Sequence, residues 1–161
     1  MSQRVFRSTD GYEPVDLLKY ARGHLHAAEV LFPKDHHSLD SAAHLSHLAI
    51  ELLLKAALLE AQGTFPGEHD LNALLVELAN AGRALSITQR NAETVALLDS
   101  FQECRYPNPR EPIEVGTEDL PAIQQLWDDL LEQLSAPLRT SFLEADQLTK
   151  GSRILMVKRD A

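Results

Sequence analysis

The strongest pattern in the chain is segment 42–62, in which apolar residues occupy almost every side of a predicted helix. At about 100° per residue, most of its polar residues fall within one arc of roughly 80°, which contains His44, His47, Glu51, Lys55 and Gln62, and only Ser46 and Glu60 lie outside it. A helix that is apolar all round is buried, and a charge inside a bundle has to be paired or to face a cleft. The arc therefore marks either a ligand site or a buried ion pair.

Helical spacing of apolar residues also predicts the other elements of the chain. We expect the central helix to run from about residue 39 to Gln62, followed by Gly63 as its C-terminal glycine. Asp70, Thr88 and Thr117 stand where the side-chain caps of later helices belong. The other predicted helices cover segments 14–32, 71–81, 88–106, 117–134 and 136–147. The chain is therefore expected to be all-α, an up-and-down bundle of about four to five helices.

The two ends of the chain differ from this bundle in composition. Segments 3–7 and 152–159 are rich in β-formers, and a lone strand cannot satisfy its own backbone groups. We expect the two segments to form a short ribbon with each other, or an edge shared with a second subunit. Segment 64–68 is expected to be a loop. The whole chain, 1–161, is expected to be a single domain with its bundle core at about 14–147.

Composition narrows the classes of protein. With 161 residues, 44% of them hydrophobic, the chain is long enough for one globular core. Its formal charge of −9 works against unspecific nucleic-acid binding, which needs lysines and arginines. The single cysteine, Cys104, excludes an intramolecular disulfide and a cysteine-based zinc site. We find no apolar run of the ~20 residues of a membrane span and no signal-peptide core, so we expect a cytoplasmic protein without membrane contact.

Three short motifs in a fixed order point to a known family. A Glu-x-x-x-Lys pair lies on the central helix, a His-Asp-Leu follows the next loop, and an Arg-Tyr-Pro ends a later helix. In this chain they occupy residues 51–55, 69–71 and 105–107. With this order and spacing, segment 17–134 resembles the HEPN domain family.

The resemblance implies a helical bundle that usually forms a homodimer. It also implies a prokaryotic protein tied to nucleotide or RNA chemistry, often beside a nucleotidyltransferase partner, as in a toxin–antitoxin pair. No cofactor is implied. We therefore expect a dimeric module that binds a nucleotide, RNA or a partner protein.

The nuclease motif of that family is missing. Nuclease members carry an Arg-x4-6-His motif that acts on the RNA phosphate, whereas here Arg105 is followed by YPNPREP and the last histidine of the chain is His69. Arg110 stands near the place of the histidine, but an arginine cannot exchange a proton near neutral pH. We therefore expect a non-catalytic protein. The alternatives are a degenerate or variant ribonuclease and a metal-binding helical bundle.

The candidate ligand-binding residues are those that carry the resemblance and one arginine of the proline-rich loop after it: Glu51, Lys55, His69, Arg105, Tyr106 and Arg110. Each has a structural alternative. Glu51 and Lys55 are spaced for an intrahelical ion pair, and His69 or Asp70 can cap the next helix. Arg105 and Tyr106 can present a fork of donors and a ring to a phosphate and base, or pack at a helix end.

A metal site is the weaker interpretation of the polar arc. Imidazoles and carboxylates on facing helices build the metal sites of bundles, which makes His44, His47 and Glu51 the candidates. However, the Glu-x-x-His pattern of di-iron bundles is missing from this arc. We expect these histidines to be satisfied by hydrogen bonds instead.

Overall fold

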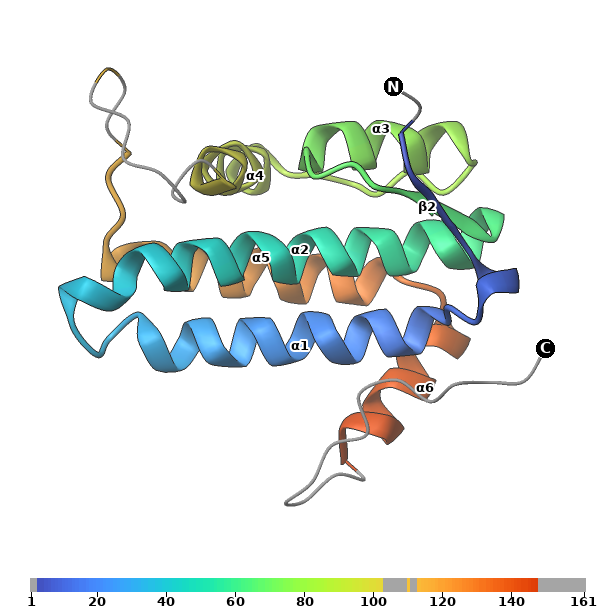
Figure 1. Ribbon diagram of the computed structural model, residues 1–161, viewed down its shortest axis with the longest axis horizontal. Helices are drawn as coiled ribbons and strands as arrows, with labels where there is room; N and C mark the ends of the chain where they lie inside the picture. Colours follow the sequence, from blue (N-terminus) through green and yellow to red (C-terminus); the bar gives the residue numbers. More distant parts are fainter. Residues whose placement is uncertain (1–2, 103–109, 111–112, 148–161) are drawn as a thin grey trace.

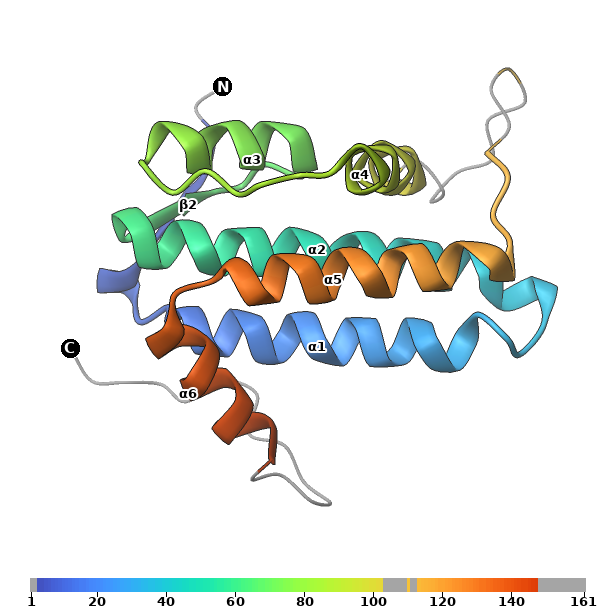
Figure 2. The ribbon, with the colours of Figure 1, turned by 180° about the vertical axis from the view of Figure 1, so that it is seen from behind.

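Two long antiparallel helices lie side by side at the centre of the fold. They are α1 (Pro14–Leu31) and α2 (Leu39–Gln62), joined by a short connection that contains the 3-10 turn His36–Ser38 (Figure 1). Helix α5 (Leu120–Gln133) packs beside α2, and α6 (Ala136–Gln147) contacts α1 (Figure 2). The computed structural model describes residues 3–102, 110 and 113–147.

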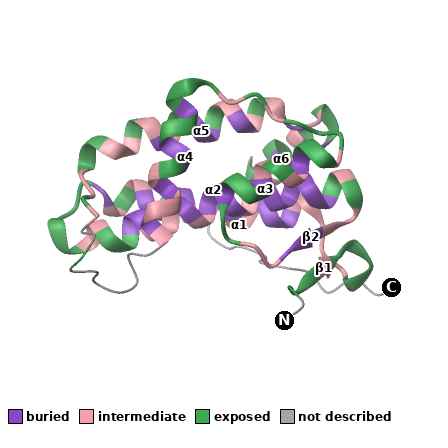
Figure 3. Cartoon of the chain, turned by 90° about the horizontal axis from the view of Figure 1, so that it is seen from above, coloured by how far each residue is buried: buried purple, intermediate pink, exposed green. Residues whose placement is uncertain are grey.

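Helices α3 (Leu71–Asn80) and α4 (Gln89–Phe101) cover another side of α2. In Figure 1, α4 is seen end-on while α2 lies across the view, so the two helices cross steeply. Helix α2 therefore has neighbours on most of its sides. Figure 3 shows the result, with buried residues concentrated in α2 and on the faces that the surrounding helices turn toward it. This arrangement is the physical reason for the all-round apolar pattern of segment 42–62.

Leucine is the commonest residue of the core, and leucines of several helices contribute to it. Leu18 of α1, Leu54 of α2, Leu74 of α3 and Leu98 of α4 are all 0% exposed. Burying one such side chain stabilises the fold by about 1.5–3 kcal/mol relative to leaving it in water. The expected all-α bundle is confirmed, and its stability comes from packing around α2.

One helix is long and apolar enough to cross a membrane. By length and composition alone, His36–Gln62 qualifies, which differs from the sequence-based expectation that no such run exists. Of its 18-residue window, 78% is buried inside the protein. Its apolar side chains therefore pack against the neighbouring helices, as in a core helix.

Most predicted helix ends are found where the capping residues stand. Asp70 Oδ1 accepts a hydrogen bond from the backbone N–H of Ala73 at 2.8 Å at the start of α3. Gly63 ends α2 in the left-handed region at φ 74°, a conformation that costs glycine least. Thr117 is a correction, because it lies in the 3-10 turn Thr117–Asp119 ahead of α5 and not at the helix cap.

A short β-ribbon is present, but the described partner of the N-terminal strand is segment 64–66, which was expected to be a loop, and not the C-terminal segment that was expected to pair with it. Strand β1 (Val5–Arg7) pairs antiparallel with β2 (Thr64–Pro66), and Phe6 lies opposite Phe65. The two rings stack at 4.8 Å and 5°, so their contact contributes along with the backbone ladder. Pro66 has no N–H to donate and sits at the end of the ribbon, where proline is tolerated. The N-terminal strand thus closes over the end of α2.

Two predicted features lie outside the described residues. The strand-like segment 152–159 is one of them, so its pairing stays a prediction. The other is the end of the fourth helix, which was expected at Tyr106, whereas the described part of α4 ends at Phe101. Arg105 and Cys104 fall in the same undescribed segment, 103–109.

Candidate functional site

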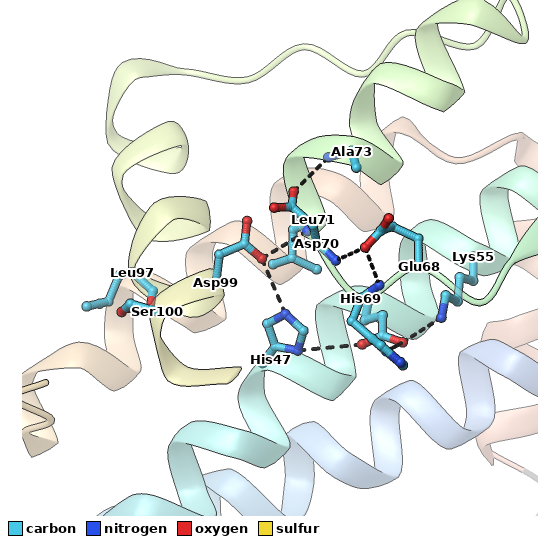
Figure 4. Close-up of polar contacts among 11 residues, drawn as sticks. His47, Lys55, Glu68, His69, Asp70, Leu71, Ala73, Leu97, Asp99 and Ser100 are labelled. Carbon is cyan, nitrogen blue, oxygen red and sulfur yellow. Dashed lines mark hydrogen bonds and ion pairs between the residues drawn. The ribbon is translucent and has the colours of Figure 1, made fainter. Parts of the chain in front are cut away.

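Glu51 is the centre of a buried polar cluster on α2. Its Oε1 accepts a hydrogen bond from Lys55 Nζ at 2.6 Å, one helical turn further along (Figure 4). Glu51 is 3% exposed and Lys55 is 4% exposed. Charges this deep are retained only when they are paired, and an acid placed four residues before a base has the favourable order. The ion pair that the polar arc predicted therefore forms, inside the bundle.

His47 extends the cluster from α2 toward α4. Its Nδ1 lies 3.6 Å from Glu51 Oε2, and its Nε2 lies 3.3 Å from Asp99 Oδ1. The same Asp99 oxygen accepts a hydrogen bond at 2.9 Å from the backbone N–H of Leu71, the first residue of α3. One carboxylate on α4 thus holds both the buried imidazole of α2 and the start of α3.

His69 is the exposed end of this cluster. Its Nδ1 lies 3.1 Å from Glu51 Oε1, and its side chain is 56% exposed. An ionised carboxylate only accepts hydrogen bonds, so this contact requires a proton on His69 Nδ1, and in the neutral form of the ring Nε2 then carries the lone pair. The loop before α3 therefore presents a largely exposed imidazole whose Nδ1 is held by Glu51 and whose Nε2 is left for a ligand.

Glu68 organises the loop that carries His69. Its Oε1 accepts hydrogen bonds from the backbone N–H groups of His69 at 2.8 Å and Asp70 at 2.9 Å. Gln3 donates to the other oxygen at 3.2 Å. The backbone N–H groups of Asp70 and then His69 hold the pKa of Glu68 below its ordinary value of 4.5. We call Glu68, His69, Asp70 and the first turn of α3 the His69 corner.

The lowered pKa of Glu68 predicts a pH dependence of stability. Because the folded pKa lies below the unfolded value of 4.5, the contribution of Glu68 is present above that pH and is lost as the pH falls through the folded pKa. Urea unfolding from about pH 6 to about pH 3 should show the gap between the chain and Glu68→Gln narrowing as acid is added. Unfolding curves that stay equally far apart over the whole range would contradict this.

The β-ribbon covers the inner side of the cluster. Phe65 of β2 is 5% exposed, and its ring centroid lies 5.9 Å from Lys55 Nζ. Phe6 stacks on Phe65, and Tyr12 meets Phe65 edge to face at 5.6 Å. An ammonium near an aromatic face is attracted by the ring, and the three rings also shield the ion pair from water. Lys55 is therefore enclosed by the ribbon.

The structure brings together some of the predicted site residues. Glu51, Lys55 and His69 share one hydrogen-bonded cluster. Arg110 is exposed. Arg105 and Tyr106 are outside the described residues. A role for these three later residues in ligand binding stays a prediction.

The candidate metal ligands are arranged differently from a metal site. His47 faces a carboxylate at each ring nitrogen, Glu51 on one side and Asp99 on the other. Over the described residues, no group of three or more His, Cys, Asp or Glu side chains has a geometry that could hold a metal ion. His44 is half-buried on α2.

Asp99 is the cluster member that the sequence did not predict. It belongs to α4, whose sequence is mostly polar, so nothing in the pattern of that helix distinguishes Asp99 from an exposed acid. Only the steep crossing of α4 over α2 brings it to His47, 52 residues away in the sequence. The missing information was therefore the packing of two helices.

The chain was compared with known proteins. The HEPN domain family matches residues 15–132. The chain belongs to the HEPN family. No curated protein and no solved structure matches it. The matched part begins in α1 and ends in α5, so this HEPN domain contains the whole Glu51 cluster, while β1 and α6 lie beyond its limits.

The cluster of this HEPN domain can accept hydrogen bonds and hold charge, but its inner members are closed to solvent. His47 is 1% exposed, and Lys55 is committed to Glu51. Acid–base chemistry on a bound substrate needs a proton donor or acceptor within hydrogen-bond reach of that substrate. Within this cluster, the exposed imidazole of His69 is the group that meets the requirement.

Proposed function

We propose that this HEPN protein is a non-catalytic, dimeric module that acts by binding a partner protein at the His69 corner. The family match supports a HEPN role, and the site supports binding rather than chemistry. The observation that carries the proposal is the closed Glu51–Lys55 pair, 2.6 Å apart and almost fully buried. A lysine that is already paired and enclosed is not available to a phosphate.

The missing nuclease motif supports the same conclusion. Cleavage of RNA by the Arg-x4-6-His arrangement needs both an anion-binding arginine and a proton-exchanging histidine. His69 is the last histidine of the chain, and it precedes Arg105. Its Nδ1 is engaged with Glu51, which leaves one ring nitrogen for a ligand.

The acidic residues around His69 favour the binding of a protein at the His69 corner over the binding of a nucleic acid. Glu68 and Asp70 flank the imidazole, and Glu51 lies beneath it, while the ammonium group of Lys55 is paired with Glu51. A phosphate backbone is bound through exposed lysines and arginines, whereas an acidic surface attracts basic side chains of a partner. The Nε2 lone pair of His69 suits a donor such as an arginine or lysine of that partner.

A homodimer and a cytoplasmic location are further parts of the proposal. They rest on what the HEPN resemblance implies and on the single-cysteine composition, which suits a reducing compartment. The partner protein most in line with the family is a nucleotidyltransferase encoded beside this chain, as in a toxin–antitoxin pair. Homodimers with two-fold symmetry are also the commonest assembly of soluble proteins.

The test combines binding, cleavage and mass measurements on one set of variants. The chain, His69→Ala and the control His36→Ala are each co-expressed with the product of the adjacent gene, and the complexes are sized by light scattering. His36 is an exposed histidine in a different loop, so its removal matches the chemical change without touching the corner. The same proteins are titrated with ATP and with single-stranded RNA, and RNA integrity is followed.

We expect the chain and His36→Ala to be dimers that bind the neighbouring protein, whereas His69→Ala loses this binding and no sample cleaves RNA. If the chain binds RNA or ATP in a way that depends on His69 and does not bind the neighbouring protein, the ligand of the His69 corner is a nucleotide and not a partner protein. Cleavage of RNA that disappears in His69→Ala would instead establish the variant ribonuclease. A mass that stays monomeric at all concentrations would refute the dimer.

A further inference from the structure

Asp99 makes contacts that join three helices at the base of the His69 corner. Its Oδ1 accepts from Leu71 N–H at 2.9 Å and lies 3.3 Å from His47 Nε2. Both partners are distant in the sequence, 28 and 52 residues away. Asp99 therefore links α4 to the first residue of α3 and to the buried imidazole of α2.

From Asp99, a polar chain leads to the exposed imidazole. His47 Nδ1 lies 3.6 Å from Glu51 Oε2, and the other oxygen of Glu51 lies 3.1 Å from His69 Nδ1 (Figure 4). The carboxylates only accept hydrogen bonds, so what His47 and Lys55 fix is the position of Glu51, and Glu51 in that position is the acceptor that favours a proton on His69 Nδ1. The position of the proton on His69 thus depends on groups beneath the surface.

The second oxygen of Asp99 argues against a purely stabilising role. Asp99 Oδ2 is buried and has no hydrogen-bond partner among the described residues. A buried carboxylate oxygen without a partner destabilises the fold, so a residue that only anchored two helices would be a poor place for an aspartate. Moreover, α3 already has a side-chain cap in Asp70, which binds Ala73 N–H.

We propose that Asp99 is a positioning residue for the His69 corner. It acts by two routes, through the backbone of Leu71 and through His47 and Glu51, and together they set the place and the tautomer of the His69 ring. The inference rests on the proposed function, since it names what prepares His69 for a partner. Through Asp99, helix α4 thus influences a binding surface to which it contributes no residue.

The test observes His69 in the free protein. Long-range proton–nitrogen NMR spectra report which ring nitrogen of each histidine carries the proton, and His36 serves as an internal reference. We expect His69 to be protonated at Nδ1 in the chain. In Asp99→Asn, the His69 signals should shift toward the Nε2–H tautomer, because His47 loses its charged partner and Glu51 is held less firmly. Asp99→Glu should restore part of the original signal.

Asp70→Ala is the matched control. It removes a cap from the same helix, next to His69, without interrupting the route through His47. We expect it to lower stability and to leave the His69 tautomer unchanged. His47→Gln tests the buried route alone, because Leu71 keeps its contact with Asp99, and it also covers the case in which Asp99→Asn does not fold. We expect it to shift His69 as Asp99→Asn does.

Unchanged His69 signals in both Asp99→Asn and His47→Gln would overturn the proposal, as would an equal shift in Asp70→Ala. These readouts do not involve a partner. If His69→Ala binds the neighbouring protein normally, the proposed function fails while the NMR result stands. If partner binding depends on His69 but the tautomer is indifferent to Asp99, the positioning role fails instead.

Discussion

Replacing Glu51 by alanine is expected to lower the free energy of unfolding by about 3–5 kcal/mol. The substitution leaves Lys55, which is 4% exposed, as a buried cation without its carboxylate. It also removes the group that His69 and His47 face. Breaking a buried pair by removing one partner is far more costly than the pair is worth, because the remaining charge stays desolvated. Urea unfolding near neutral pH measures the loss.

A double variant separates two quantities: the net contribution of the ion pair to stability, and the destabilisation caused by leaving one of its charges unpaired. In Glu51→Leu with Lys55→Met, both charges are replaced by apolar side chains of similar size. Such replacements are often neutral or stabilising, so we expect the double variant to unfold at a much higher urea concentration than Glu51→Ala. If the double variant is as unstable as Glu51→Ala, the pair itself stabilises the bundle and the desolvation argument is wrong.

Removing the Phe65 ring is expected to cost about 3–5 kcal/mol as well. Phe65 is 5% exposed and contacts Phe6 by stacking and Tyr12 edge to face. In Phe65→Ala, β1 loses its main side-chain contact on β2, and Lys55 loses its aromatic cover. We therefore expect a large drop in stability together with rapid proteolysis of the segment before α1.

Phe6→Ala is the comparison for this variant. Phe6 is half-buried and belongs to the same stack, so its loss should loosen the ribbon at a smaller cost in stability. Proteolysis before α1 should increase in both variants. A ribbon that stays protected in Phe65→Ala would mean that the backbone ladder alone holds β1.

The sequence predicted those parts of the fold that depend on local chemistry. Helix α2 follows from its apolar pattern, and its end follows from Gly63, which adopts the left-handed conformation at φ 74°. The start of α3 follows from Asp70, whose side chain caps the first turn. The Glu51–Lys55 pair follows from spacing alone, because both residues belong to one helix.

The features that could not be predicted depend on contacts between distant segments. Strand β2 has three residues, too few for a periodic pattern, and exists because β1 pairs with it across almost 60 residues of chain. Asp99 resembles the other exposed acids of the sequence until α4 crosses α2. His69 was a candidate from its motif, but its hydrogen bond to Glu51 required the fold.

The hydrogen bond from Gln3 to Glu68 places the start of the described chain next to the His69 corner, which matters for the choice of a tag or label. Whatever is attached ahead of Gln3 leaves the molecule beside the His69 corner. An affinity tag or a fused domain at that end would stand in front of the His69 corner and mask it. The same proximity makes that end suitable for a small fluorescent dye, whose emission would change when something occupies the corner.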